Sequence, residues 1–150
     1  MSDPNAPTSH PAPVMSRDDL QDLMRRDFSQ VADDFLIEEV RSMGCRVRLE
    51  VDERHLRPGG TVSGPTMFGL ADVSVYLATM AMIGPQTLAV TTNIAMDFMR
   101  KPEAGRDLIA ETRLLKLGKR LSVGDVLIYS DGRPEPVARA SMTYAIPPRS

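Results

Sequence analysis

The fold of this chain is decided by one apolar segment, MFGLADVSVYLATMAMI, which covers residues 67–83. Asp72 stands inside it and is the only charged residue between Arg57 and Asp97. The segment is short for a membrane span and also holds Asp72, Ser74 and Thr79, so we expect a buried helix rather than a transmembrane one. A helix that is apolar nearly all round needs cover on several sides, from a sheet that curls around it or from a partner subunit.

Asp72 itself has two interpretations. Burying a carboxylate is costly because desolvation disfavours its charged form, so a lone acid in such a segment is a candidate for chemistry. The other interpretation is a helix residue at a polar interface or in a capping hydrogen bond. The residue alone leaves both open.

The flanking sequence predicts an antiparallel sheet around that helix. Ser16 caps a first helix that we expect to end near Phe35. Pro65 suits the first turn of the long helix, which we expect to stop at Gly84. Alternating apolar and polar residues predict strands at 37–41, 45–52, 88–99, 108–117, 121–129 and 137–146. The connections between the last four are too short for crossover helices, so the fold class is α+β.

Composition restricts the class of protein further. The chain has 150 residues, of which 42% are hydrophobic, and this predicts one domain with a real core over residues 16–150. Residues 1–15 contain four prolines and are expected to form a flexible leader. A net charge of −2 argues against nucleic acid as a partner. One cysteine excludes an internal disulfide, and two histidines offer no zinc spacing, so we expect no metal. The N-terminus lacks signal-peptide features, and we therefore expect a cytoplasmic protein that does not associate with membranes.

Three segments carry a resemblance to a known family. Residues 55–72 read HLRPGGTVSGPTMFGLAD, residues 90–102 read VTTNIAMDFMRKP, and residues 118–121 read GKRL. They resemble the signature H-x-N-x-x-G-x-x-H-G-G-x4-L-A-D, the strand V-[ST]-x6-F-x-R-P and the hairpin of the PaaI-like (phenylacetic acid degradation) hotdog acyl-CoA thioesterases. The resemblance covers roughly residues 35–146. It implies the hotdog fold, an antiparallel sheet wrapped around one long central helix.

The resemblance also implies a site. It gives Asp72 the role of nucleophile or general base in thioester hydrolysis, the Gly64 backbone N–H that of donor to the thioester carbonyl, and the Thr91 hydroxyl that of placing the attacking water. The role given to Gly64 is chemically reasonable, because a helix N-terminus offers unpaired N–H groups and a positive dipole end to a developing oxyanion. The reaction needs no cofactor.

This chain departs from the family signature at three positions. Arg57 replaces the Asn, Ser63 replaces the His, and Pro65 replaces the second glycine. Arg57 could polarise the carbonyl, or it could pair with Asp72 and leave a pocket without hydrolysis. The alternative function is therefore a non-catalytic acyl-CoA binding or sensing protein. A hotdog hydratase ranks third, because it would need His55 beside Asp72.

Other residues are candidates for contacts with the substrate. Arg100, Lys119 and Arg120 are candidates for the phosphates of coenzyme A, although solvated charges are an equally good interpretation of each. Tyr76 lies one turn beyond Asp72 and either faces the substrate or packs as a core aromatic. The resemblance further implies a homodimer or a homotetramer built as a dimer of dimers, with Asp72 of one chain facing Gly64 of the other.

Overall fold

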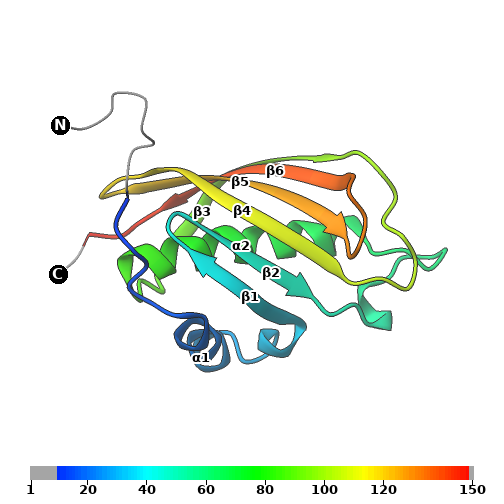
Figure 1. The fold of residues 1–150 in the computed structure, drawn as a ribbon, viewed down its shortest axis with the longest axis horizontal. Helices are drawn as coiled ribbons and strands as arrows, with labels where there is room; N and C mark the ends of the chain where they lie inside the picture. The colour runs from blue at the N-terminus through cyan, green and yellow to red at the C-terminus, as the bar shows by residue number, and fades with distance from the viewer. Residues whose placement is uncertain (1–9, 149–150) are drawn as a thin grey trace.

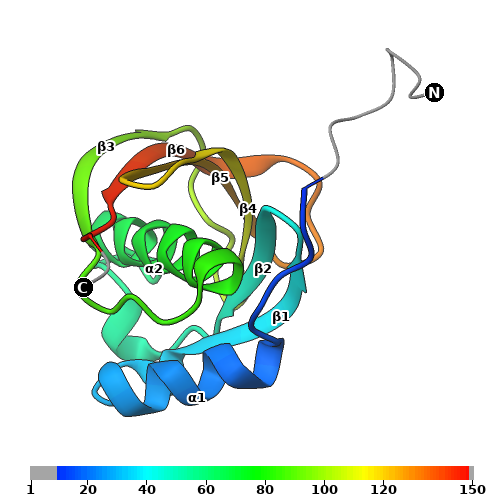
Figure 2. The same ribbon diagram turned by 90° about the vertical axis from the view of Figure 1, so that its left-hand side faces the viewer.

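A computed structural model describes residues 10–148 and has a six-stranded antiparallel sheet wrapped around one long helix, α2 (Gly64–Ile83) (Figure 1, Figure 2). The expected α+β hotdog architecture is confirmed. The strands are β1 (Phe35–Arg41), β2 (Gly44–Leu49), β3 (Val90–Phe98), β4 (Leu108–Leu117), β5 (Leu121–Ser130) and β6 (Pro136–Ala145). They are ordered β1-β2-β4-β5-β6-β3, with every neighbouring pair antiparallel.

Residues at its two ends determine where the central helix begins and ends. Ser63 is the N-cap, and its hydroxyl accepts a hydrogen bond from the Thr66 N–H at 3.3 Å. The helix starts at Gly64, one residue before the expected Pro65, which occupies its first turn. It ends at Ile83, and its C-cap residue Gly84 has a φ of 84°, a conformation open to glycine at little cost.

The hollow of the sheet buries α2 on most sides. By length and composition this helix could cross a membrane, but 67% of its most apolar window is buried inside the fold. Two of its buried hydroxyl groups are paired within that core. The Ser74 hydroxyl donates to the Leu70 carbonyl at 2.7 Å, and the Thr79 hydroxyl bonds the Val75 carbonyl and Ser122 at 2.8 Å each. These bonds offset the cost of burying the hydroxyls.

The first helix is shorter than predicted. Helix α1 (Arg17–Asp27) is capped by Ser16, as expected, but it ends at Asp27 and not near Phe35. The chain turns after Phe28 and passes through a short 3-10 turn, Ala32–Asp34, so that Phe35 can begin β1. Tertiary pairing of β1 with β2 therefore overrides the continuing helical pattern.

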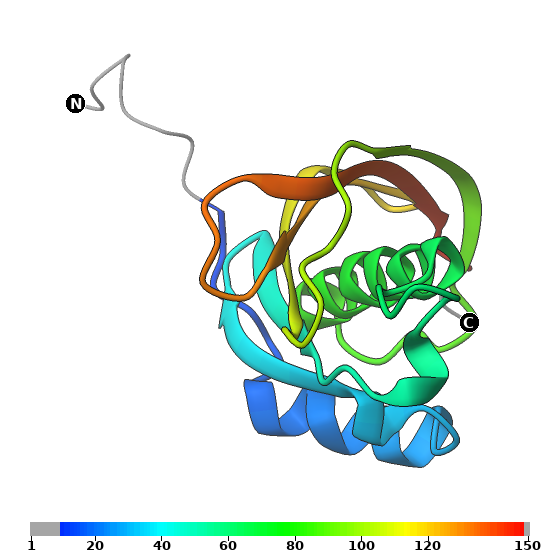
Figure 3. The same ribbon diagram turned by 90° about the vertical axis from the view of Figure 1, so that its right-hand side faces the viewer.

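Helix α1 covers one edge of the sheet (Figure 3). It buries Leu20, Leu23 and Met24 and packs against β1. The side-chain amide of Gln21 donates to the Phe35 carbonyl at 3.1 Å and accepts from the Ile37 N–H at 3.3 Å. Backbone groups of this edge strand thus find partners within the chain, which is one way to protect a sheet edge.

The opposite edge of the sheet, β3, lacks such cover from residues 10–148. Within that described range β3 pairs only with β6, and most of its residues are exposed. Leu88, Val90 and Phe98 are 79%, 56% and 53% exposed. An open edge that carries large apolar side chains is a candidate for pairing with another chain.

The segment before α1 is partly held in place. Residues 1–9 of the expected leader lie outside the described residues. The N–H groups of Val14 and Met15 donate to the Ala81 carbonyl at 2.7 and 3.2 Å, and Met15 is buried. This end of the leader differs from the expectation of a flexible segment, because it pairs with the last turn of α2.

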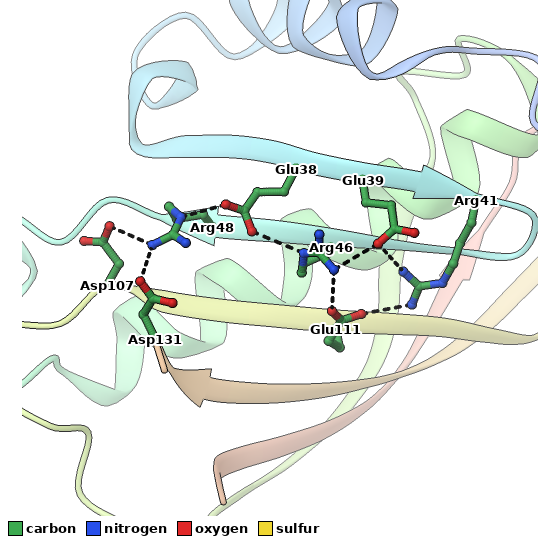
Figure 4. A network of polar contacts seen from close by, with 8 residues as sticks. All are labelled: Glu38, Glu39, Arg41, Arg46, Arg48, Asp107, Glu111 and Asp131. Carbon is green, nitrogen blue, oxygen red and sulfur yellow. Dashed lines mark hydrogen bonds and ion pairs between the residues drawn. The ribbon is translucent and has the colours of Figure 1, made fainter. Parts of the chain in front are cut away.

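The outer face of the sheet carries a network of alternating charges across β1, β2 and β4 (Figure 4). Arg46 and Arg48 point outward, while Cys45, Val47 and Leu49 point into the core, as the alternation predicted. The network joins Glu38, Glu39, Arg41, Arg46, Arg48, Asp107, Glu111 and Asp131. Single pairs of this kind contribute about 0–1 kcal/mol, and their main effect here is to neutralise the face.

Candidate active site

Asp72 lies half-buried on α2, where it faces β3 and β6. The Thr91 hydroxyl on β3 donates to Asp72 Oδ1 at 2.6 Å. Two predicted site residues are therefore brought together from segments nineteen positions apart. A threonine hydroxyl that donates to the carboxylate keeps two lone pairs, with which it can still accept a hydrogen bond from water.

Sequence reasoning missed a second donor, Tyr144. Its hydroxyl on β6 donates to Asp72 Oδ1 at 2.5 Å and lies 3.0 Å from the Asp72 backbone oxygen. Burial first, and then the Asp72 carboxylate, raise the pKa of Tyr144 far above its usual range, so the hydroxyl stays protonated. The available signal was periodicity: Tyr144 shares the inward face of its strand with Ala140 and Met142, and a hydroxyl on that face needs a partner.

A cavity of about 240 Å³ opens beside this carboxylate, and we call it the Asp72 cavity. Apart from Asp72 and the two hydroxyl residues that bond it, its lining is largely apolar. It is formed by Met24, Phe28, Asp72, Val73, Tyr76, Ala89, Val90, Thr91 and Tyr144. Engineered apolar cavities of about 150 Å³ hold benzene, so this space suits a compact acyl group.

Tyr76 forms part of the wall of the Asp72 cavity. It also packs as a core aromatic, with its ring in an edge contact with Phe28 at 5.4 Å. Burial raises its pKa to about 12, and its hydroxyl has no hydrogen-bond partner among residues 10–148.

A second cavity, the Gly64 cavity, lies at the N-terminus of α2 and measures about 460 Å³. It brings Gly64 together with Arg57, Arg100 and Lys101, three cationic side chains that are exposed. Its wall is completed by Thr61, Val62, Met67, Phe98, Met99 and Pro102. An N-terminal N–H surrounded by cations suits an oxyanion and a negatively charged ligand.

Arg57 does not pair with Asp72 within one chain. No described carboxylate lies within ion-pair distance of its guanidinium. Ser63 is occupied as the helix cap and also lies 2.8 Å from the Thr66 hydroxyl. Its side chain therefore serves the start of α2.

The remaining cationic candidates lie at the other end of the sheet. Lys119 and Arg120 are exposed in the β4–β5 turn, and the Arg120 carbonyl accepts from the Ile146 N–H at 2.8 Å. The strand register puts this turn at the end of the sheet that holds Tyr144, and not at the end that holds Gly64. One chain does not gather all the predicted coenzyme A contacts in one cavity.

The predicted carbonyl donor and the predicted base or nucleophile also lie apart within one chain. Gly64 and Asp72 are eight residues apart on one helix, which separates their backbones by roughly 12 Å. Strand β3 connects the two cavities, with Thr91 at the Asp72 end and Phe98 at the Gly64 end. A single thioester carbonyl cannot contact both groups of the same chain.

His55 has a different environment from Asp72. Its Nδ1 accepts from the Asp52 N–H at 2.9 Å, and its Nε2 lies 3.5 Å from Asp34. It is absent from the lining of the Asp72 cavity. The arrangement that a hydratase would need is not found within the described part of the chain.

A larger depression, about 580 Å³, lies on the outer face of the sheet, on the side away from α2. Its charged groups include Arg139 and Asp97, which pair at 2.7 Å, and Arg41 and Glu111, which pair at 3.0 Å. Because these charges neutralise one another, the smaller cavity beside the carboxylate is the better candidate for chemistry.

Such a carboxylate, on the central helix of a curled antiparallel sheet, defines the class of hotdog thioesterases. A family model described as the Thioesterase superfamily matches residues 59–137, more than half of the chain. The chain belongs to this superfamily.

Relatives agree with this assignment. The crystal structure of a candidate thioesterase from Silicibacter sp. TM1040 is 54% identical, with a TM-score of 0.86 over 91% of this chain and 94% of that one. A protein of Pseudomonas aeruginosa that is named as a candidate esterase is 34% identical over 67% of this chain and 74% of its own length. A variant of the phenylacetic acid degradation protein PaaI from Thermus thermophilus has 25% identity and a TM-score of 0.67, over 84% of this chain and 99% of that one. The resemblance to the PaaI-like family is confirmed.

Proposed function

We propose that this protein hydrolyses an acyl-CoA thioester to the free acid and coenzyme A. The observation that carries the proposal is the environment of the Asp72 carboxylate. Its carboxylate borders a compact, largely apolar cavity, and it is held by two hydroxyl groups instead of being neutralised by a cation. Such a carboxylate suits a general base or a nucleophile.

The proposed catalytic unit is a dimer. If the open edge of β3 pairs antiparallel with its copy, a twofold axis brings the Thr91 end of one strand to the Phe98 end of the other. The Asp72 cavity of one chain then meets the Gly64 cavity of its partner. This arrangement removes the separation of roughly 12 Å that exists within each chain.

In that dimer the acyl group occupies the Asp72 cavity, and the partner subunit's Gly64 N–H faces the carbonyl oxygen. The partner subunit's Arg57 and the partner subunit's Arg100 also come to the same side. Lys119 and Arg120 lie at the Asp72 end of the sheet in the same chain as Asp72. Cationic side chains of both chains therefore lie near the proposed position of the thioester. This supports the phosphates of coenzyme A as the charged part of the ligand.

The proposed reaction adds water across the thioester. Asp72 takes a proton from water as the water oxygen attacks the carbonyl carbon, and the carbonyl electron pair moves to oxygen beside the Gly64 N–H. When the carbonyl re-forms, the carbon–sulfur bond breaks, and the leaving thiolate takes up a proton, so that the proton held by Asp72 is given up and its carboxylate is restored. Direct attack by Asp72, followed by hydrolysis of the resulting anhydride, uses the same geometry.

The first prediction concerns Asp72. Purified protein should release free thiol from compact acyl-CoAs, and Asp72→Asn should lower kcat by about 10³-fold or more, because the base or nucleophile is lost. Thiol release from a panel of acyl-CoAs, measured with a colorimetric thiol reagent, tests this. Asp125→Asn, on a strand away from the cavity, is the matched control. Equal rates for wild type and Asp72→Asn would refute the assignment.

The alternative is a non-catalytic acyl-CoA binding protein. It is favoured by Arg57 and Ser63, which stand where the family has Asn and His, and by the use of Ser63 as a helix cap. Calorimetry would separate the two functions: tight binding of acyl-CoA with no thiol release over hours supports the alternative. A tetramer built from two such dimers and a cytoplasmic location remain parts of the proposal.

A further inference from the structure

Within the part of the chain that the structure describes, the Asp72 carboxylate is hydrogen-bonded at only one of its two oxygens. Both hydroxyl donors, Thr91 at 2.6 Å and Tyr144 at 2.5 Å, converge on Oδ1. No hydrogen bond from residues 10–148 reaches Oδ2. We infer that Tyr144 is a positioning residue, which together with Thr91 fixes Oδ1 and leaves Oδ2 as the oxygen that reacts. The inference rests on the proposed function.

The donor–acceptor geometry fixes which bond Tyr144 makes. A tyrosine hydroxyl carries one proton, so it donates to one acceptor at a time. Its distance to Oδ1 is in the range of a charge-assisted O–H···O⁻ bond, about 2.5–2.7 Å, whereas the backbone oxygen of Asp72 is 3.0 Å away. The carboxylate is therefore the acceptor.

The strand pairing explains why the two donors meet. Thr91 on β3 lies directly opposite Tyr144 on β6, and Ser122 on β5 flanks Tyr144 on its other side. Strand β3 has a bulge between Thr91 and Asn93, a feature that re-aims side chains beside active sites. The Tyr144 residue is 4% exposed and packs near the Tyr76 ring at a centroid distance of 6.1 Å. Both donors therefore sit on paired strands, and Tyr144 in addition lies within the core.

The hydrogen bonds at Oδ1 should affect the chemical step of hydrolysis. A carboxylate held at Oδ1 cannot rotate freely, so Oδ2 keeps a constant direction toward the cavity. Without Tyr144 the group can turn about its terminal torsion, which is broad for aspartate. Productive alignment is then lost more often, while the apolar wall that binds the acyl group remains. The expected loss is in kcat and not in KM.

The test compares two tyrosines. Tyr144→Phe removes only the hydroxyl, and we expect kcat for acyl-CoA hydrolysis to fall roughly 10- to 100-fold with KM changed less than about twofold. Tyr129→Phe, on β5 outside the cavity lining, is the control and should match wild type.

A second variant makes the result independent of how well Tyr144→Phe packs. Thr91→Val removes the other donor from an exposed strand, and it should also lower kcat. The double variant should lose less than the product of the two single losses, because both donors hold the same oxygen. Crystal structures of the wild type and of Tyr144→Phe should show a single carboxylate orientation in the first and a rotated or divided one in the second.

The outcomes separate this inference from the proposed function. Absence of thiol release by wild type, across the acyl-CoA panel, overturns both. An active wild type with unchanged kcat in Tyr144→Phe overturns only the inference. So does a loss that appears in KM alone, or an equal loss in Tyr129→Phe.

Discussion

The chemistry of this chain depends on how single polar groups are paired inside an apolar fold. Asp72 was visible in the sequence because no other charge lies near it along the chain. Its hydroxyl partners come from strands far along the sequence, and only they make the half-buried position tolerable without a cation. An aspartate held in this way keeps a fixed direction toward the cavity.

His55 gives a prediction at the same scale. Burial first, and the nearby Arg54 guanidinium second, lower the pKa of His55, whereas the Asp52 carboxylate opposes them. Its unprotonated Nδ1 also accepts the Asp52 N–H, and Asp34 faces its other nitrogen. The unfolded chain therefore binds the proton more readily, so the contribution of His55 to stability is complete above its ordinary pKa of 6.5 and is lost as the pH falls below it.

The measurement is urea unfolding at about pH 7.5 and about pH 5.5, on either side of the ordinary value. Each unit by which the pKa is lowered corresponds to about 1.4 kcal/mol at most. His55→Gln should lose less stability between the two pH values than wild type does. A variant with the same pH dependence as wild type would show that other groups account for it.

At the level of elements, the proposed role of the Gly64 backbone N–H at the start of α2 can be tested without introducing a polar or charged side chain. Gly64 lies at the first helical position, where an added Cβ would meet the Phe98 ring at an ordinary 3.5 Å. Proline is tolerated at such a position, and Ser63 already has the extended conformation that precedes proline. Gly64→Pro therefore removes the N–H while the helix start is kept.

We expect Gly64→Pro to lower kcat by about 10²- to 10³-fold, because a donor to the developing oxyanion is lost. Gly64→Ala keeps the N–H and is the matched control, with a much smaller effect. Both variants are compared by steady-state kinetics and by thermal unfolding. Equal losses in the two variants would point to crowding at the Phe98 ring and not to the missing donor.

The same element scale shows what could be predicted from sequence. Helix α2 and strands β4 to β6 were predicted nearly to their bounds, because caps, turn residues and alternation are local signals. Helix α1 was predicted too long, since its end is set by the pairing of β1 with β2. Tyr144 was missed because its role depends on the residue opposite, which local patterns do not identify.

For the whole molecule, the contrast between its two sheet edges predicts association. The β1 edge is covered by α1 through Gln21, whereas β3 is open and apolar. Sedimentation at micromolar concentration should therefore find a dimer or a tetramer. A monomer at that concentration would contradict the shared site.

Mixed dimers test the shared site directly. Asp72→Asn and Gly64→Pro each retain little activity by the predictions above, but a heterodimer of the two contains one site with an intact Asp72 and an intact facing N–H. Co-expression should restore activity to about a quarter of wild type for random pairing in a twofold dimer. Two different Asp72 variants, co-expressed in the same way, are the control and should restore nothing. Recovery in neither case would place both groups in one chain.

The sequence by itself determined the long apolar helix, the strands around it and the acid within that helix, because these follow from periodicity, capping and charge along the chain. The resemblance to the PaaI-like family added the hotdog class. The tertiary structure decided which donors hold that acid, which carboxylate oxygen remains free and which sheet edge stays open. Those features depend on contacts between residues remote in sequence, and strand register and packing fix such contacts only once the whole chain has folded.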